Sequence, residues 1–115
     1  MIEANADTFG IENLPTYKFN NADLIVSFGA DFLGTWISPV EFTGQYSSRR
    51  KITKENTNIL KHVQLESSLS LTGSNADLRI AINTSEEGKI LLNIYCTLAV
   101  KSGKNTSPCS SSTVN

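Results

Sequence analysis

A chain of 115 residues, 39% of them hydrophobic and 18% charged, predicts one domain with a modest core and argues against intrinsic disorder. Its formal net charge of -1 gives neither a basic field for nucleic acid nor a cationic face for a membrane surface. The apolar runs are far shorter than the roughly 18 residues that span a bilayer, and the start MIEANADTFG lacks the basic residues of a signal peptide.

The N-terminal third predicts a short helix, a loop and a strand. Residues 1–9 favour the helix, and Pro15 with the following asparagines favours a loop over 10–21. The run ADLIVSFGA, residues 22–30, is nearly continuously apolar. Such a run is typical of a strand that is covered on both faces at the centre of a parallel sheet.

A helix start follows at Ser38. Ser38 has the position of an N-cap, Pro39 is at the first helical position, and Glu41 completes a capping box. We expect this helix to continue to about Arg50 and a polar link, 54–58, to follow it. We also expect the loss of the Ser38 hydroxyl to cost about 1 kcal/mol.

The second half predicts two strands and a helix. Residues 59–67 and 78–82 favour strands, and the serine-rich segment between them favours a loop. Residues 84–100 favour a helix that Thr84 caps, with Glu87 three residues on. One face of this helix is apolar at helical spacing, through Ile90, Leu91, Ile94, Leu98 and Ala99.

The order of these elements predicts an α/β fold, a small Rossmann-like parallel sheet with flanking helices. We interpret residues 1–100 as one α/β piece of a larger domain. The tail, 101–115, is small and polar, and we expect it to be disordered or to be the cut end of a longer chain.

Two strand ends are candidate ligand sites, because open α/β sheets bind ligands beyond the carboxyl ends of their strands. The first is Gly29-Ala30-Asp31, and the second begins at Glu66, with Thr72 and Asp77 as further polar contacts. Neither GxGxxG nor a P-loop lysine is present. The plainer alternative is that Gly29 relieves a tight turn, that Glu66 is a solvated loop residue and that Asp77 forms a turn.

Other polar residues favour structural roles. His62 is the only histidine, and no serine or cysteine nucleophile pattern lies near it. Arg49, Arg50 and Lys51 suit a solvated helix end. Neither Cys96 nor Cys109 has a CxxC partner, so we expect no metal ligand set, and we interpret Cys96 as a small buried hydrophobe.

The segments NADLIVSFGADFLGTWISPVEF and HVQLESSLSLTGSNADLRIAI resemble molybdopterin oxidoreductases of the dimethyl-sulfoxide-reductase class. The likeness is greatest to the molybdopterin-oxidoreductase-like part of the iron–sulfur subunit of bacterial alternative complex III, a quinol:electron-acceptor oxidoreductase. It covers roughly residues 1–100. Cofactor-bearing members of the class carry molybdopterin guanine dinucleotide and iron–sulfur clusters.

The resemblance implies cofactor-binding positions in this chain, which are vestigial if the cofactor has been lost. The Gly-Ala-Asp turn and the acid that ends the next strand would line the nucleotide half of the molybdopterin guanine dinucleotide. The positions in this sequence are Gly29, Ala30, Asp31, Glu66 and Thr72. Ser67-Ser68 and Asn83-Thr84 replace the Pro-Arg and Arg-Pro of the family pattern. The loss of these cations argues against binding of phosphates.

The sequence therefore predicts a non-catalytic structural piece of a respiratory oxidoreductase subunit, without a cofactor of its own. Its expected partners are the rest of its parent subunit and the other subunits of a membrane-bound complex at the periplasmic face, and as an isolated fragment it could form a homo-oligomer. One alternative is a wall of the nucleotide site in a true molybdopterin enzyme. Another is a free-standing binding module.

Overall fold

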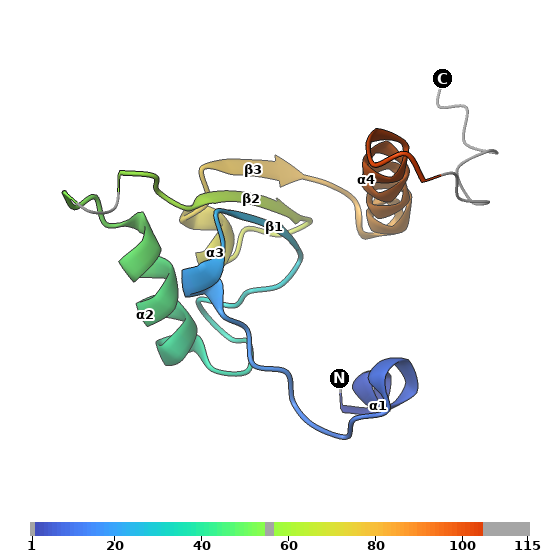
Figure 1. The fold of residues 1–115 in the computed structure, drawn as a ribbon, viewed down its shortest axis with the longest axis horizontal. Coiled ribbons are helices and arrows are strands. Elements are labelled where there is room, and N and C mark those ends of the chain that lie inside the picture. Colours follow the sequence, from blue (N-terminus) through green and yellow to red (C-terminus); the bar gives the residue numbers. More distant parts are fainter. Residues whose placement is uncertain (1, 55–56, 105–115) are drawn as a thin grey trace.

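The computed structural model describes residues 2–54 and 57–104. Its strands are β1 (Leu24–Phe28), β2 (Lys61–Glu66) and β3 (Leu78–Ala81). They form a parallel sheet in the order β1-β2-β3 (Figure 1). Val26 lies opposite Val63, and Leu65 lies opposite Ile80. The predicted α/β class with a parallel sheet is confirmed.

The helical elements connect and flank these strands (Figure 1). They are α1 (Ile2–Phe9), η1 (Phe19–Asn21), α2 (Pro39–Arg50), α3 (Leu71–Ser74), η2 (Thr84–Glu86) and α4 (Glu87–Lys101). The short α3 lies in the segment that we predicted to be a loop throughout. Most of the predicted tail, 105–115, and part of the predicted polar link lie outside the described residues. None of the described helices is long and apolar enough to cross a membrane.

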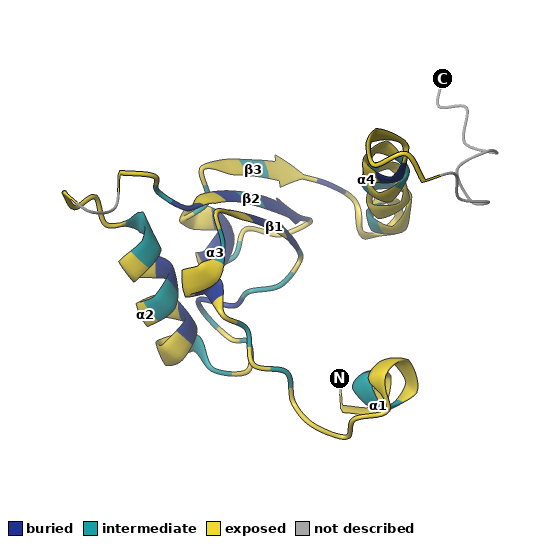
Figure 2. Cartoon of the chain, viewed as in Figure 1, coloured by how far each residue is buried: buried dark blue, intermediate teal, exposed yellow. Residues whose placement is uncertain are grey.

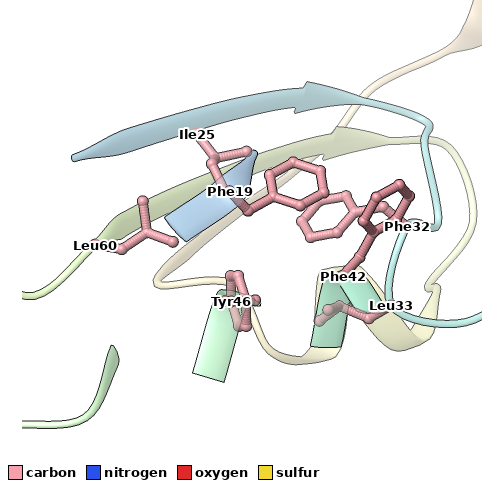
Figure 3. Packing of buried hydrophobic residues seen from close by; sticks show 7 residues of the cluster. All are labelled: Phe19, Ile25, Phe32, Leu33, Phe42, Tyr46 and Leu60. Carbon is pink, nitrogen blue, oxygen red and sulfur yellow. The ribbon is translucent and has the colours of Figure 1, made fainter. Parts of the chain in front are cut away.

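The core is an aromatic cluster between one face of the sheet and α2. Phe32 and Phe42 are each 1% exposed. The ring of Phe19 stacks on Phe32 with centroids 4.6 Å apart and meets Phe42 edge-on at 5.1 Å. Figure 3 shows these rings gathered below Ile25 of β1, with Tyr46 of α2 beside them. Phe19 begins η1 and Phe32 lies in the turn after β1, so the core also fixes the chain before and after β1.

The predicted place of β1 is wrong: it is an edge strand, and only one of its faces is covered. Ile25 and Ser27 point to the core and are buried, whereas Leu24 is 57% and Val26 45% exposed. The outward-facing residues Leu24, Val26 and Phe28 are apolar as well. The sequence of this strand therefore resembles that of a strand buried on both faces, although only one face is covered. Leu78 and Ile80 of β3 continue the same uncovered face of the sheet.

Helix α4 lies beyond the C-terminal ends of the strands and does not cover the sheet (Figure 1). Its substantial contacts are with η2, and its surface is mostly exposed in Figure 2. Leu91, Tyr95 and Leu98 are 56%, 49% and 61% exposed. Of the apolar stripe that predicted this helix, Leu91 and Leu98 are therefore exposed, whereas Ala99 is buried. Ile90 and Ile94 are half-buried, so the stripe is only partly covered among the described residues.

Two predictions about this region are wrong. Thr84 does not cap α4: a 3-10 turn, η2, precedes the helix, and the Glu86 carboxylate accepts hydrogen bonds from the N–H and the side-chain amide of Asn83, each at 3.1 Å. Asn83, a residue type that favours capping positions, is the N-cap of η2, and the N-cap of α4 itself is Glu86, whose side chain makes no capping hydrogen bond to the helix. Cys96 is half-buried and disulfide-bonded rather than a buried thiol.

The start of α2 also differs from its predicted capping box. The helix begins at Pro39 as expected, but the Ser38 side chain makes no capping hydrogen bond. The chain reaches Ser38 through Ile37 at φ 32, and Ser38 then has ψ 71 rather than the extended backbone of a typical N-cap. Glu41 accepts instead from the Gln45 amide at 3.0 Å.

We therefore expect Ser38→Ala to change the free energy of unfolding by less than about 0.5 kcal/mol. Ser70→Ala is the matched comparison, because the Ser70 hydroxyl accepts from Gly73 N and donates to Glu66. That variant should lose about 1–2 kcal/mol. Urea unfolding followed by circular dichroism measures both. A loss of about 1 kcal/mol or more for Ser38→Ala would restore the capping box that the sequence predicts.

Candidate functional site

The predicted cofactor-binding residues lie together where β1 and β2 end. Gly29 follows β1 directly, and its N–H donates to Leu65 O of β2 at 2.8 Å. Its φ of 60 lies in the left-handed region that favours glycine. The Ala30 carbonyl accepts from the Ser27 hydroxyl and the Gln64 amide, each at 3.4 Å. The turn therefore has the tight geometry that both the ligand-site and the plainer interpretation of Gly29 require.

Asp31 and Thr72 join this turn to α3. Asp31 Oδ1 accepts from the Thr72 N–H at 3.0 Å and from its hydroxyl at 2.8 Å. The Thr72 hydroxyl in turn accepts from the N–H of Leu33 at 2.9 Å, and Thr72 is fully buried. A Cβ at Gly34 would overlap the Asp31 carboxylate, so a glycine there lets the loop close around it. Asp31 thus links the turn after β1 to α3.

Glu66 is buried, so its interpretation as a solvated loop residue is wrong. It is 3% exposed and accepts four hydrogen bonds. The donors are Ser70 Oγ at 2.6 Å, Ser70 N at 3.2 Å, Arg79 Nε at 2.6 Å and Gln64 Nε2 at 3.2 Å. Burial alone would raise the pKa of Glu66, but the hydrogen bonds from Ser70, Arg79 and Gln64 together outweigh it and lower this pKa to about 2. Glu66 is therefore a buried carboxylate that stays ionised.

Gly73 leaves room for the Glu66 carboxylate. It is buried in α3, and a Cβ at this position would overlap the Glu66 carboxylate. The absence of a side chain lets α3 approach the end of β2 closely. The hydroxyl of Ser70 also accepts from Gly73 N at 2.9 Å. The carboxylate and the start of α3 are therefore fitted to each other.

A row of polar side chains continues from Glu66 along the core face of β2. His62 and Gln64 are fully buried. His62 Nε2 lies 3.2 Å from Gln64 Oε1, and its Nδ1 lies 3.1 Å from the Tyr46 hydroxyl. Burial lowers the pKa of His62 against the opposing effect of Gln64, which favours a neutral ring. These contacts support the structural role that the sequence predicts for the histidine.

The two arginines that end α2 lie in its last turn, as predicted, and they also form ion pairs at the surface that the sequence did not predict. Arg50 meets both carboxylate oxygens of Asp77 at 2.6 Å, and Arg49 meets Asp23 at 2.6 Å. Asp77 also accepts from His62 N at 2.7 Å. The hydrogen bond from Arg50 is the largest cause that lowers the pKa of Asp77 to about 2. Asp77 lies at the start of β3, away from the strand ends that form the candidate site.

The arrangement offers little to a phosphate or to catalysis. The cation at the site, Arg79, is already paired with Glu66. The Glu87 carboxylate of α4 lies close to Gly29, within 3.8 Å of where a Cβ would stand, and adds negative charge at the turn. Within residues 2–54 and 57–104, no group of three or more His, Cys, Asp or Glu side chains could hold a metal ion. The site is best suited to hold two loops and a helix together.

Three residues that complete the site were not predicted from the sequence: Gln64, Ser70 and Arg79. Gln64 had a visible signal, because a glutamine on the core side of an apolar strand requires polar partners when it is buried. Ser70 followed by Gly73 has the spacing of an N-cap and its N3 position. Arg79 had no local signal, since its contact with Glu66 depends on the register of β3 against β2.

The chain matches no protein-family model, and no curated protein matches it either.

Proposed function

We propose that this chain is a non-catalytic structural piece of a respiratory oxidoreductase subunit. Its parent would take part in quinol oxidation and electron transport within a membrane-bound complex at the periplasmic face. The motif GADFLGTWISPVEF, which resembles the alternative-complex-III subunit, supports the assignment to that class. The parent family's molybdopterin guanine dinucleotide and iron–sulfur clusters would lie outside this chain.

The observation that carries the proposal is the internal use of the strand-end acids. A carboxylate that holds a ribose hydroxyl needs a free acceptor and access to the ligand. Glu66 has neither, because it is 3% exposed and accepts from Ser70, Arg79 and Gln64. Asp31 is likewise engaged with Thr72. The contacts of these acids support a role in holding the fold.

The uncovered apolar surfaces support the place of this chain within a larger domain. Parallel sheets are normally covered on both faces, and here one face exposes Leu24, Val26, Leu78 and Ile80. Further exposed apolar side chains lie on α4. The remainder of the parent subunit and its neighbours in the complex are the partners that would cover these surfaces.

The second candidate is a wall of a nucleotide site in a true molybdopterin enzyme. One observation favours it: Gly29, Asp31, Glu66 and Thr72 lie together at the strand ends, which is where open parallel sheets bind nucleotides. The Arg79–Glu66 pair would then have to open for the cation to meet a phosphate.

Calorimetric titration with GDP or GMP separates these two functions. We expect no detectable heat at millimolar nucleotide, because a single wall with engaged acids and the nearby Glu87 offers too few contacts to offset the cost of ordering a ligand. The measurement uses the full chain at neutral pH and low salt.

Micromolar binding would contradict the structural proposal if Glu66→Ala abolished it in a chain that stays folded by circular dichroism. Glu41→Ala removes an exposed carboxylate from α2 and is the matched control. It should leave any such binding unchanged. Binding that both variants retain would place the nucleotide elsewhere and would leave the strand-end acids structural.

A further inference from the structure

We propose that the outer edge of β1 is a self-association surface, on which two copies of this chain pair antiparallel about a two-fold axis at Val26. The proposal concerns the backbone of one strand. It does not depend on the function proposed above, which concerns the strand-end acids and the open face of the sheet.

The outer edge of β1 carries unpaired backbone groups. Lys61 N donates to Asp23 O, and Gly29 N donates to Leu65 O, so odd-numbered residues of β1 face β2. Because the N–H and C=O groups of a strand alternate in direction, those of Leu24, Val26 and Phe28 face outward. Among the described residues, β1 pairs with no strand other than β2.

This edge lacks the features that protect edge strands from association. Natural edges are interrupted by proline, by a bulge or by a charged side chain, most often lysine. The five residues of β1, LIVSF, contain none of these charges or prolines. Val26, at the centre of the strand, is 45% exposed. A second copy of the chain that pairs along this edge would therefore meet no like charge on β1, and no backbone N–H donor would be missing.

The edge is complementary to itself in one register. Antiparallel pairing exchanges both backbone hydrogen bonds between outward-facing residues. A two-fold axis at Val26 sets Val26 against Val26 of the second copy and Leu24 against Phe28. All outward donors and acceptors of β1 are then used, in about six hydrogen bonds, and a closed symmetric dimer results.

An apolar hollow beside this edge adds to the surface that pairing would bury. It has a volume of about 380 Å³ and lies along β1, and its lining includes the aromatic rings of Tyr17, Phe19, Phe32 and Trp36. Ile25 and Ser27 also line it, so the hollows of two paired copies meet near the axis. Burial of apolar surface supplies the driving force, and the backbone fixes the register.

Charge complementation at residue 26 tests the proposal. Sedimentation velocity on the full chain, over about 5–500 µM, should give a concentration-dependent dimer. Val26→Lys and Val26→Glu should each weaken association by about tenfold or more, because like charges would face each other across the axis. An equimolar mixture of the two variants should restore the dimer. Since Val26 is an exposed side chain, both variants should keep the circular dichroism spectrum of the parent chain.

Two further variants separate this edge from the other apolar surfaces. Val26→Pro removes the outward N–H and should abolish the dimer, whereas Ile80→Pro, at the outer edge of β3, should leave it intact. Leu98→Lys on α4 should also leave it intact. A monomer at every concentration overturns the proposal. A dimer that Leu98→Lys disrupts, or variants at residue 26 that fail to complement each other, overturn it as well.

Discussion

Replacing Phe42 with alanine should cost about 3–5 kcal/mol of the free energy of unfolding. Phe42 is 1% exposed and contacts the rings of Phe19, Tyr17 and Trp36. Its removal would leave a cavity between α2 and the segments that carry these three rings. The packed rings have little freedom to collapse into that cavity. A domain of ordinary stability, about 5–15 kcal/mol, would lose much of its margin.

Val40→Ala is the matched control, because Val40 lies on the same helix and is 87% exposed. It should change the free energy of unfolding by less than about 0.5 kcal/mol. Phe42→Leu keeps most of the volume and should cost less than the alanine variant, which provides a measurable result if Phe42→Ala does not fold. Urea denaturation followed by circular dichroism measures all three. Equal losses for Phe42→Ala and Val40→Ala would contradict the core described above.

Arg79→Met should cost about 2–4 kcal/mol at neutral pH. The Arg79 Nε–Glu66 Oε1 pair is 2.6 Å long, and the Glu66 side chain is 3% exposed. Methionine keeps much of the aliphatic length but leaves a buried carboxylate without its cation. Ser70 and Gln64 still donate to that carboxylate, which limits the loss.

The loss should depend on pH in a defined direction. The ordinary pKa of Glu66, 4.5, is lowered to about 2 in the folded chain. The ionised group therefore contributes stability above about pH 5 that disappears as the pH falls toward 2. Without the Arg79 hydrogen bond the folded pKa of Glu66 moves upward. The difference in stability between the two proteins should then shrink as the pH falls.

Lys61→Met removes the same charge from an exposed position of β2 and should show only a small difference at every pH. Urea midpoints measured from pH 7 down to about pH 3 follow all three proteins. A difference between the parent chain and Arg79→Met that is constant over this range would mean that Glu66 is not the group responsible.

Local sequence predicted the elements and the class of the sheet better than it predicted their surroundings. The strands at β1 and β2 and the helix at Pro39 could be identified because apolar periodicity and proline position are local signals. The surroundings of β1 could not be predicted in this way. Leu24 and Val26 are apolar whether or not a layer covers their face of the sheet. Whether a strand has a neighbour is decided elsewhere in the chain.

The candidate site shows the same division. Residues that follow strands directly, such as Asp31 and Glu66, could be placed near each other because parallel strands end at one edge of the sheet. Their state could not be predicted. Glu66 is buried because Gly73 lets α3 approach it and because the register of β3 brings Arg79 to it. Contacts between distant segments of the chain decide whether such an acid meets a ligand or its own protein.

Helix α4 has a consequence for whatever covers it. It has 15 residues, and an isolated helix of that length is only marginally stable in water. Among the described residues its substantial contacts are with η2, so beyond the Cys96 disulfide packing there adds little to its order. Covering α4 and completing its helix–coil transition are therefore coupled events. A partner would lose part of its binding free energy to this ordering, and the contact would be weaker, and more easily reversed, than its apolar area suggests.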